Sequence, residues 1–104
     1  MQSFREALDE RIILFDGAMG TEIYARGVFI NRCYDEMNLA NPDMVLDIHK
    51  AYAAAGAEVL TANTFGANRM RLAPFGLQDR FEQITREVVR LAREAAGTNC
   101  WVAG

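Results

Sequence analysis

Three short apolar runs along the chain predict strands, of which the first is expected to be buried on both faces and the second to be buried. They occupy residues 11–15 (RIILF), 57–62 (AEVLTA) and 100–104 (CWVAG). A compact run of about four to eight mainly apolar residues, bounded by turn residues, is typical of a strand in a parallel sheet. The first run ends at Asp16-Gly17, and the second leads into Asn63.

Between these runs, apolar residues recur at helical spacing. The helices that these patterns predict cover residues 4–9, 42–55 and 79–96, with one further helical turn at 68–72. Ser3 is a favourable N-cap for the first, and Asn41 followed by Pro42 is a strong start for the second. Gly56 and Gly97 stand where left-handed C-terminal caps are expected. Residues 79–96 carry the clearest single apolar face.

The resulting order is helix, strand, long loop, helix, strand, short loop, helix, strand, which indicates an α/β fold. Helical crossovers between parallel strands are right-handed, so we expect the strands side by side in the order 1-2-3 with both crossover helices on one face. No GxGxxG follows a strand, which argues against a dinucleotide-binding sheet. Residues 17–40 have an irregular pattern, and such a long excursion is usually functional or disordered.

Length and charge narrow the classes further. The 104 residues are too few for a complete (β/α)₈ barrel, which takes about 250. Eleven Lys+Arg against fourteen Asp+Glu give a net charge of −3, and the basic residues are scattered, so nucleic-acid binding is not expected. There is no apolar run of membrane-spanning length, and the charged N-terminus is unlike a secretory leader, so we expect a cytoplasmic protein that does not bind membranes.

Cysteine and arginine usage adds little chemistry by itself. Cys33 and Cys100 stand 67 positions apart without CxxC spacing, which suits a reducing compartment and does not predict a metal site. Arg69 and Arg71 form either a phosphate or carboxylate site or, as the pattern favours, a solvated rim. His49 lies on a predicted helix away from any strand end and is interpreted as an outer-face or packing residue.

The candidate site lies where the strands end, because ligands of α/β folds bind at the carboxyl ends of strands. After the first strand, Asp16, Gly17 and Ala18 begin a glycine-rich loop whose backbone N–H groups can form an anion-binding concavity. Asp16 is either part of that site or a turn former that holds the loop. Asn63 and Thr64 offer an amide and a hydroxyl after the second strand, for binding or for loop capping.

Linked motifs give a more specific interpretation. DGAMGTE after the first strand, the NPD helix start and GAEVLTANTFGAN at the second strand resemble the homocysteine S-methyltransferase family, closest to its cobalamin-dependent methionine synthase type. The likeness runs from about residue 11 to 104. It implies a (β/α)₈ TIM barrel of which residues 1–104 are an N-terminal fragment, with about three strands and two crossover helices.

The resemblance also implies roles for the candidate residues. In this family the loop after the first strand and the Thr of the NTF segment hold the carboxylate of homocysteine. On this chain these positions are Asp16, Gly17 and Ala18, with Thr64 opposite and Asn63 supporting it. No catalytic residue is assigned.

The family's cofactors are expected outside this chain. The resemblance implies zinc held by cysteines of a later GGCC-type motif, to which neither Cys33 nor Cys100 corresponds. It also implies methylcobalamin on a partner domain as methyl donor, recharged by methyltetrahydrofolate, so cobalamin- and folate-binding domains are the expected partners. Betaine or S-methylmethionine is the alternative donor.

A different class of function stays open. The chain is either part of a methyltransferase that makes methionine from homocysteine, or a non-catalytic truncated module with half of the substrate cradle. In the second case its unpaired strand edges favour self-association.

Overall fold

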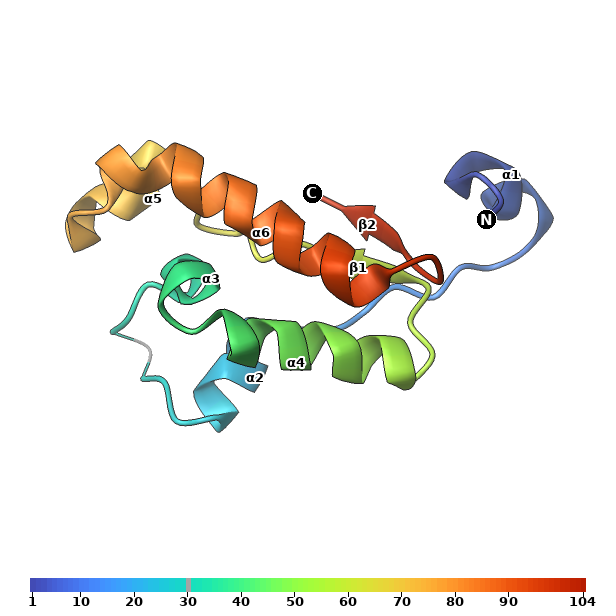
Figure 1. Cartoon of the computed structure of the whole chain (residues 1–104), viewed down its shortest axis with the longest axis horizontal. Coiled ribbons are helices and arrows are strands. Elements are labelled where there is room, and N and C mark those ends of the chain that lie inside the picture. The colour runs from blue at the N-terminus through green and yellow to red at the C-terminus, as the bar shows by residue number, and fades with distance from the viewer. Residues whose placement is uncertain (30) are drawn as a thin grey trace.

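The two longest helices, α4 (Pro42–Ala54) and α6 (Phe81–Ala96), lie side by side in the computed structural model and form most of the core (Figure 1). Val45 and Ile48 of α4 pack with Leu91 of α6, and each is at most 1% exposed. As the sequence predicts, the Asn41 side chain caps α4 by accepting a hydrogen bond from the Met44 N–H at 3.3 Å.

The structure describes residues 1–29 and 31–104. The remaining elements are α1 (Phe4–Glu10), α2 (Gly20–Ala25), η1 (Tyr34–Glu36), α3 (Met37–Ala40), β1 (Val59–Thr61), α5 (Arg69–Leu72), η2 (Ala73–Phe75), η3 (Gln78–Arg80) and β2 (Trp101–Ala103). The helices expected at 4–9, 42–55, 68–72 and 79–96 are therefore present within one or two residues of their predicted bounds. No helix in the described ranges is long and apolar enough to cross a bilayer.

The sheet has the predicted parallel order. β1 and β2 are parallel neighbours, with Val59 opposite Trp101. On the other side of β1, Phe15 forms a parallel bridge to Val59, and the Asp16 N–H donates to the Val59 carbonyl at 3.0 Å. The segment before Asp16, β1 and β2 thus follow one another in the order 1-2-3, and the fold is α/β.

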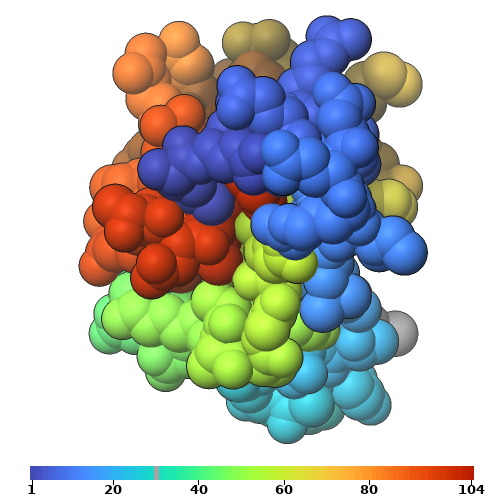
Figure 2. Space-filling view, turned by 90° about the vertical axis from the view of Figure 1, so that its right-hand side faces the viewer, coloured from blue at the N-terminus to red at the C-terminus, as the bar shows by residue number. Residues whose placement is uncertain are grey.

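Both crossover helices cover the same face of the sheet. Leu60 is fully buried in a cluster that includes Ala53 of α4 and Ala96 of α6. The opposite face carries Val59 and a cavity of about 260 Å³, part of whose lining is Phe4 of α1. The Phe4 ring stands edge-on to Trp101 at 5.7 Å, and Figure 2 shows the N-terminal segment packed against the C-terminal part of the chain. The position of both crossover helices on one face distinguishes this arrangement from a doubly wound sheet.

The prediction of a fully buried first strand is wrong. Residues 11–15 form one isolated bridge instead of a regular strand. Ile12 is 94% exposed and Leu14 is 57% exposed. The reason is that strand side chains project from the faces of a sheet, and Ile12 and Leu14 pack against none of the buried clusters of the described residues. An apolar run indicates that a segment is suited to burial, but its side chains become buried only where another segment packs against them.

Residues 17–40 also differ from the expected irregular loop, because they contain α2, η1 and α3. Ile23 of α2 and Met37 of α3 are 0% and 2% exposed and pack with Val45 of α4. Each of these short helices contributes only one or two buried residues, and α2 has no side-chain cap. A periodicity that needs several turns to be visible cannot reveal helices of this length.

The exposed edge at residues 11–15 has a measurable consequence. Residues 12–15 of this edge are apolar and free of charge and proline, and such an edge promotes pairing with another chain. We therefore expect the chain to self-associate at high concentration and Ile12→Lys to shift it toward the monomer, as measured by sedimentation velocity. Met70→Lys is the matched control, because Met70 is 87% exposed on α5, outside this edge. A chain that stays monomeric at all concentrations would contradict this expectation.

Candidate functional site

A cavity of about 290 Å³ opens at the carboxyl end of β1. Gly17, Asn63 and Thr64 line it, so the structure brings three of the five predicted site residues to one place. The other lining residues are Met19, Gly20, Tyr34, Asp35, Thr61, Ala62 and Phe65. The lining contains no Lys or Arg and one carboxylate, that of Asp35, so an anion would have to bind through neutral donors such as backbone N–H groups or a hydroxyl.

Asp16 and Ala18 lie beside this cavity and are not part of its lining. The Asp16 carboxylate accepts a hydrogen bond from the Thr61 N–H at 2.9 Å, so it ties the first loop to β1. The Ala18 carbonyl accepts one from the Tyr52 hydroxyl at 2.6 Å. These contacts correspond to the loop-holding alternative for Asp16, while a direct contact with substrate stays a prediction.

The first loop is held close to α4 at Gly17. A Cβ atom at this position would lie 3.0 Å from the Tyr52 hydroxyl oxygen, closer than ordinary van der Waals contact. Together with the Tyr52–Ala18 hydrogen bond, this approach places the loop backbone at the mouth of the cavity. The glycine is required here for space, since its φ is not among the positive values found in this chain.

Asn63 and Thr64 have different roles in the turn after β1. Asn63 is 7% exposed, and its Nδ2 donates to the Tyr34 carbonyl at 2.8 Å, so the amide group has the structural role of the two considered. Thr64 is half-buried, and its hydroxyl makes only a long contact of 3.5 Å to the Ala62 carbonyl. Of the two side chains, Thr64 is the one whose polar group is only weakly engaged by the protein itself.

Sequence reasoning missed the segment that forms the other wall, which carries Tyr34 and Asp35. The Asp35 carboxylate is buried and accepts a hydrogen bond from the Gly66 N–H at 3.1 Å. Burial raises the pKa of Asp35, against the lowering effects of that hydrogen bond and of the Arg71 charge. No spacing along the chain connects these residues to the turn, because the contact spans 31 positions and is purely tertiary.

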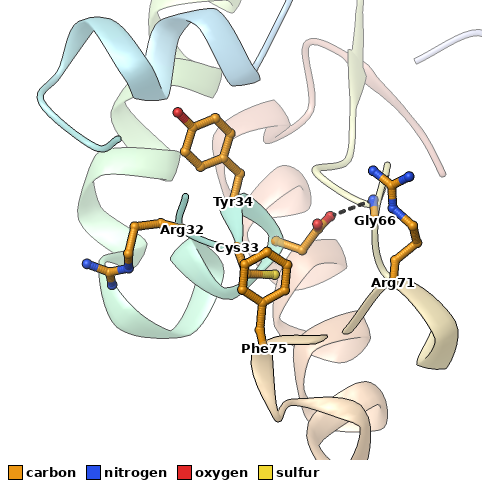
Figure 3. Close-up of a pocket in the computed structure, with 7 residues that line it drawn as sticks. Arg32, Cys33, Tyr34, Gly66, Arg71 and Phe75 are labelled. Atoms are coloured by element: carbon orange, nitrogen blue, oxygen red, sulfur yellow. Dashed lines mark hydrogen bonds between the residues drawn. The ribbon is translucent and has the colours of Figure 1, made fainter. Parts of the chain in front are cut away.

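A second cavity of about 210 Å³ shares Tyr34 and Asp35 with the first (Figure 3). Arg32 and Arg71 line it, but their guanidinium groups point in different directions in Figure 3. Arg71 lies 5.8 Å from the Phe65 ring centroid, and Arg69 lies 4.8 Å from that of Phe81. The Arg69 and Arg71 side chains therefore stack on separate aromatic rings, which agrees with the rim interpretation of this pair.

The described residues do not fit a zinc ion. Residues 1–29 and 31–104 contain no group of three or more His, Cys, Asp or Glu side chains that could hold a metal. Cys33 and Cys100 are buried in separate clusters, and burial raises the pKa of both thiols. Zinc binds thiolates, so this environment opposes the form that a metal would require.

Of the two interpretations of His49, an outer-face residue or a packing residue, the structure supports the packing residue. It is 0% exposed on α4, and neither ring nitrogen has a hydrogen-bond partner in the described part of the chain. Burial lowers the pKa of His49, because the imidazolium form loses its hydration, although the charge of Asp16 opposes this shift.

This lowered pKa predicts how stability changes with pH. The unfolded imidazole takes up a proton near its ordinary pKa of 6.5, while the folded one stays neutral to lower pH. The contribution of His49 to the free energy of unfolding is therefore present above pH 6.5 and lost as the pH falls, by up to about 1.4 kcal/mol per pH unit. In urea titrations from pH 7.5 to 5, His49→Gln should show a weaker pH dependence than the unsubstituted chain. Because the chain has one histidine, equal slopes would refute this assignment.

Comparisons with known proteins agree with the motifs at this site. A family model described as homocysteine S-methyltransferase matches residues 13–104. The methionine synthases of Mycobacterium tuberculosis and Mycobacterium leprae are 31% and 30% identical over 97 residues, covering 88% of this chain and 8% of each relative.

Solved structures of the homocysteine methyltransferase MmuM from Escherichia coli are similar in fold. The metallated form has a TM-score of 0.79 at 31% identity over 90% of this chain and 34% of that one. The oxidised form has a TM-score of 0.81 at 29% identity, over 96% of this chain and 39% of that one. The chain thus spans well under half of these relatives. From the family match over nearly all of its length, the chain belongs to the homocysteine S-methyltransferase family.

Proposed function

We propose that residues 1–104 supply half of a homocysteine-binding cradle, as the N-terminal part of a (β/α)₈ barrel domain. The observation that carries the proposal is the cavity at the end of β1, lined by Gly17 and Thr64 in a chain of this family. The amino-acid carboxylate of the substrate is an acceptor only, so it needs converging donors. Backbone N–H groups around Gly17 and the Thr64 hydroxyl are such donors.

The five site residues have different roles in this proposal. Gly17 and Thr64 face the ligand, whereas Asp16 holds the loop to Thr61 and Ala18 holds it to Tyr52. Asn63 supports Thr64 from the next position by binding the Tyr34 carbonyl. The neutral donors keep the carboxylate ionised by hydrogen bonding to its charged form, which is the stronger kind of hydrogen bond.

The barrel assignment rests on the arrangement of strands and helices. Parallel neighbours in the order 1-2-3 with α4 and α6 on one face are what the start of a barrel requires, since its other face points inward. The similarity to MmuM over 96% of this chain supports the same architecture.

For the complete enzyme, we propose transfer of a methyl group from methylcobalamin to homocysteine to form methionine. The similarity to methionine synthases supports this donor, together with cobalamin- and folate-binding domains as partners. Zinc would lower the pKa of the homocysteine thiol and so make a nucleophile. Because the described residues do not fit zinc, we place its ligands outside this chain.

A test of the cradle removes one donor. Thr64→Val keeps the shape of the side chain and loses the hydroxyl, so the affinity for L-homocysteine should fall by about tenfold or more, the effect of one hydrogen bond to a charged group. Isothermal titration calorimetry measures the change. Thr98→Val, at an exposed position after α6, is the control that should bind as the unsubstituted chain does.

Two results would contradict the cradle. One is equal affinity of the Thr64→Val variant and the unsubstituted chain, and the other is no saturable binding of L-homocysteine by the unsubstituted chain. The second result would favour the alternative function, a self-associating module, for which the exposed edge at Ile12 is the supporting observation.

A further inference from the structure

The turn that carries Thr64 has little support of its own. Within it, the Thr64 N–H donates to the Ala62 carbonyl at 2.9 Å and the Ala67 N–H to the Thr64 carbonyl at 3.0 Å. Phe65, its large apolar side chain, is 92% exposed. An exposed turn with few buried apolar contacts opens easily unless other elements hold it.

Segment 34–38 holds this turn at both ends through three hydrogen bonds, and a fourth lies within the segment itself. At its start, the Asn63 Nδ2 donates to the Tyr34 carbonyl at 2.8 Å, and the Asn38 Nδ2 donates to the Asn63 carbonyl at 3.5 Å. The same Asn38 nitrogen donates to the Asp35 carbonyl at 2.6 Å. At the end of the turn, the Gly66 N–H donates to Asp35 Oδ1 at 3.1 Å. Thr64 lies between these two anchor points.

Asp35 is the charged member of this set, and its burial is costly. It is 7% exposed, and no Lys or Arg of the described residues lies within ion-pair distance of its carboxylate. A buried carboxylate loses hydration that hydrogen bonds must replace. The Gly66 N–H supplies such a bond, which is the dashed line at Gly66 in Figure 3.

Gly66 shows independently that the approach is close. A Cβ atom at this position would lie 2.5 Å from Asp35 Oδ2, a separation that side chains do not adopt. The φ of Gly66 is not among the positive values of this chain, so the residue is needed for space and not for its backbone conformation. The Asp35 carboxylate thus occupies the space that a side chain at position 66 would fill.

We propose that Asp35 is a positioning residue, whose hydrogen bond to the Gly66 N–H fixes the turn and places the Thr64 hydroxyl in the cavity. This inference rests on the proposed function, because the hydroxyl matters only if it binds the substrate. Asp35 acts through Thr64 and is not assigned a contact with homocysteine. Its role would add a third segment to the cradle, between the two loops that sequence motifs identify.

The first experiment needs no ligand and measures amide hydrogen exchange by NMR. In Asp35→Ala, the Gly66 N–H loses its acceptor, so exchange of the 64–66 amides should accelerate by about tenfold or more, while amides of α6 keep their protection. Asp35→Asn retains an acceptor oxygen and should retain protection. Asp47→Ala, at an exposed position of α4, is the matched control. Unchanged exchange at Gly66, or faster exchange throughout α6, would overturn a local positioning role.

The second experiment tests action through Thr64, using L-homocysteine titrations. Asp35→Ala alone should weaken binding by about tenfold, but in a Thr64→Val background by less than about twofold, because coupled residues are not additive. A full tenfold loss in both backgrounds, or no loss in either, would overturn the proposal. If the unsubstituted chain does not bind L-homocysteine, the proposed function fails and this inference fails with it, whereas the exchange data still report on the Asp35–Gly66 contact.

A second variant keeps the test decisive if Asp35→Ala does not fold. In Gly66→Ala, the added methyl group would displace the Asp35 carboxylate from the Gly66 N–H. This variant should therefore accelerate exchange of the 64–66 amides and weaken L-homocysteine binding, as Asp35→Ala does. Combining it with Asp35→Asn should give no recovery, since the Asn side chain occupies the same space. Full protection of the turn in Gly66→Ala would show that the close approach is not required, and would overturn the proposal.

Discussion

The packing of α4 and α6 over Leu60 is the contact on which the rest of the structure depends. Leu60 is fully buried, because residues of both helices enclose its side chain. Parallel strands joined by right-handed crossovers put both helices on this face. As a consequence, the carboxyl ends of β1 and of the segment before Asp16 lie at the same edge of the sheet. The two loops that follow these ends meet there. The cavity at Gly17 and Thr64 is a product of this topology.

Around that cavity, polar groups are mainly engaged with one another. Asp16, Asn63 and Asp35 each bind a backbone group of a neighbouring segment. Buried polar groups need such partners, and the resulting network gives loops without large cores a defined position. The Thr64 hydroxyl differs from them because its internal contact is long. A rigid polar surround with one loosely bound donor is a suitable arrangement for recognising a small acidic ligand.

The opposite face and the first strand edge show what the same topology leaves uncovered. Phe4 and Trp101 cover part of the inner face, yet Ile12 and Leu14 remain exposed. In the barrel that we propose, each strand has neighbours on both sides, so a further strand would pair with this exposed edge. The relatives that match this chain in fold are more than twice its length, which agrees with that interpretation.

The sequence by itself determined the elements whose signals are local, and its motifs predicted the candidate site residues. Ser3 and Asn41 are capping residues whose hydrogen bonds lie within three positions, so their helices were predictable from neighbouring residues. The parallel order followed from the alternation of strands and helices, and Gly17, Asn63 and Thr64 followed from the positions of strand ends.

Tertiary structure alone decided features that depend on distant partners. The exposure of Ile12 depends on which segments pair with it, and the same apolar run is equally compatible with full burial. The place of Asp35 beside Gly66 and the contact of the Asp16 carboxylate with the Thr61 N–H rest on hydrogen bonds that span 31 and 45 positions. Hydrophobic periodicity and capping act over a few residues, so they carry no information about contacts at such separations.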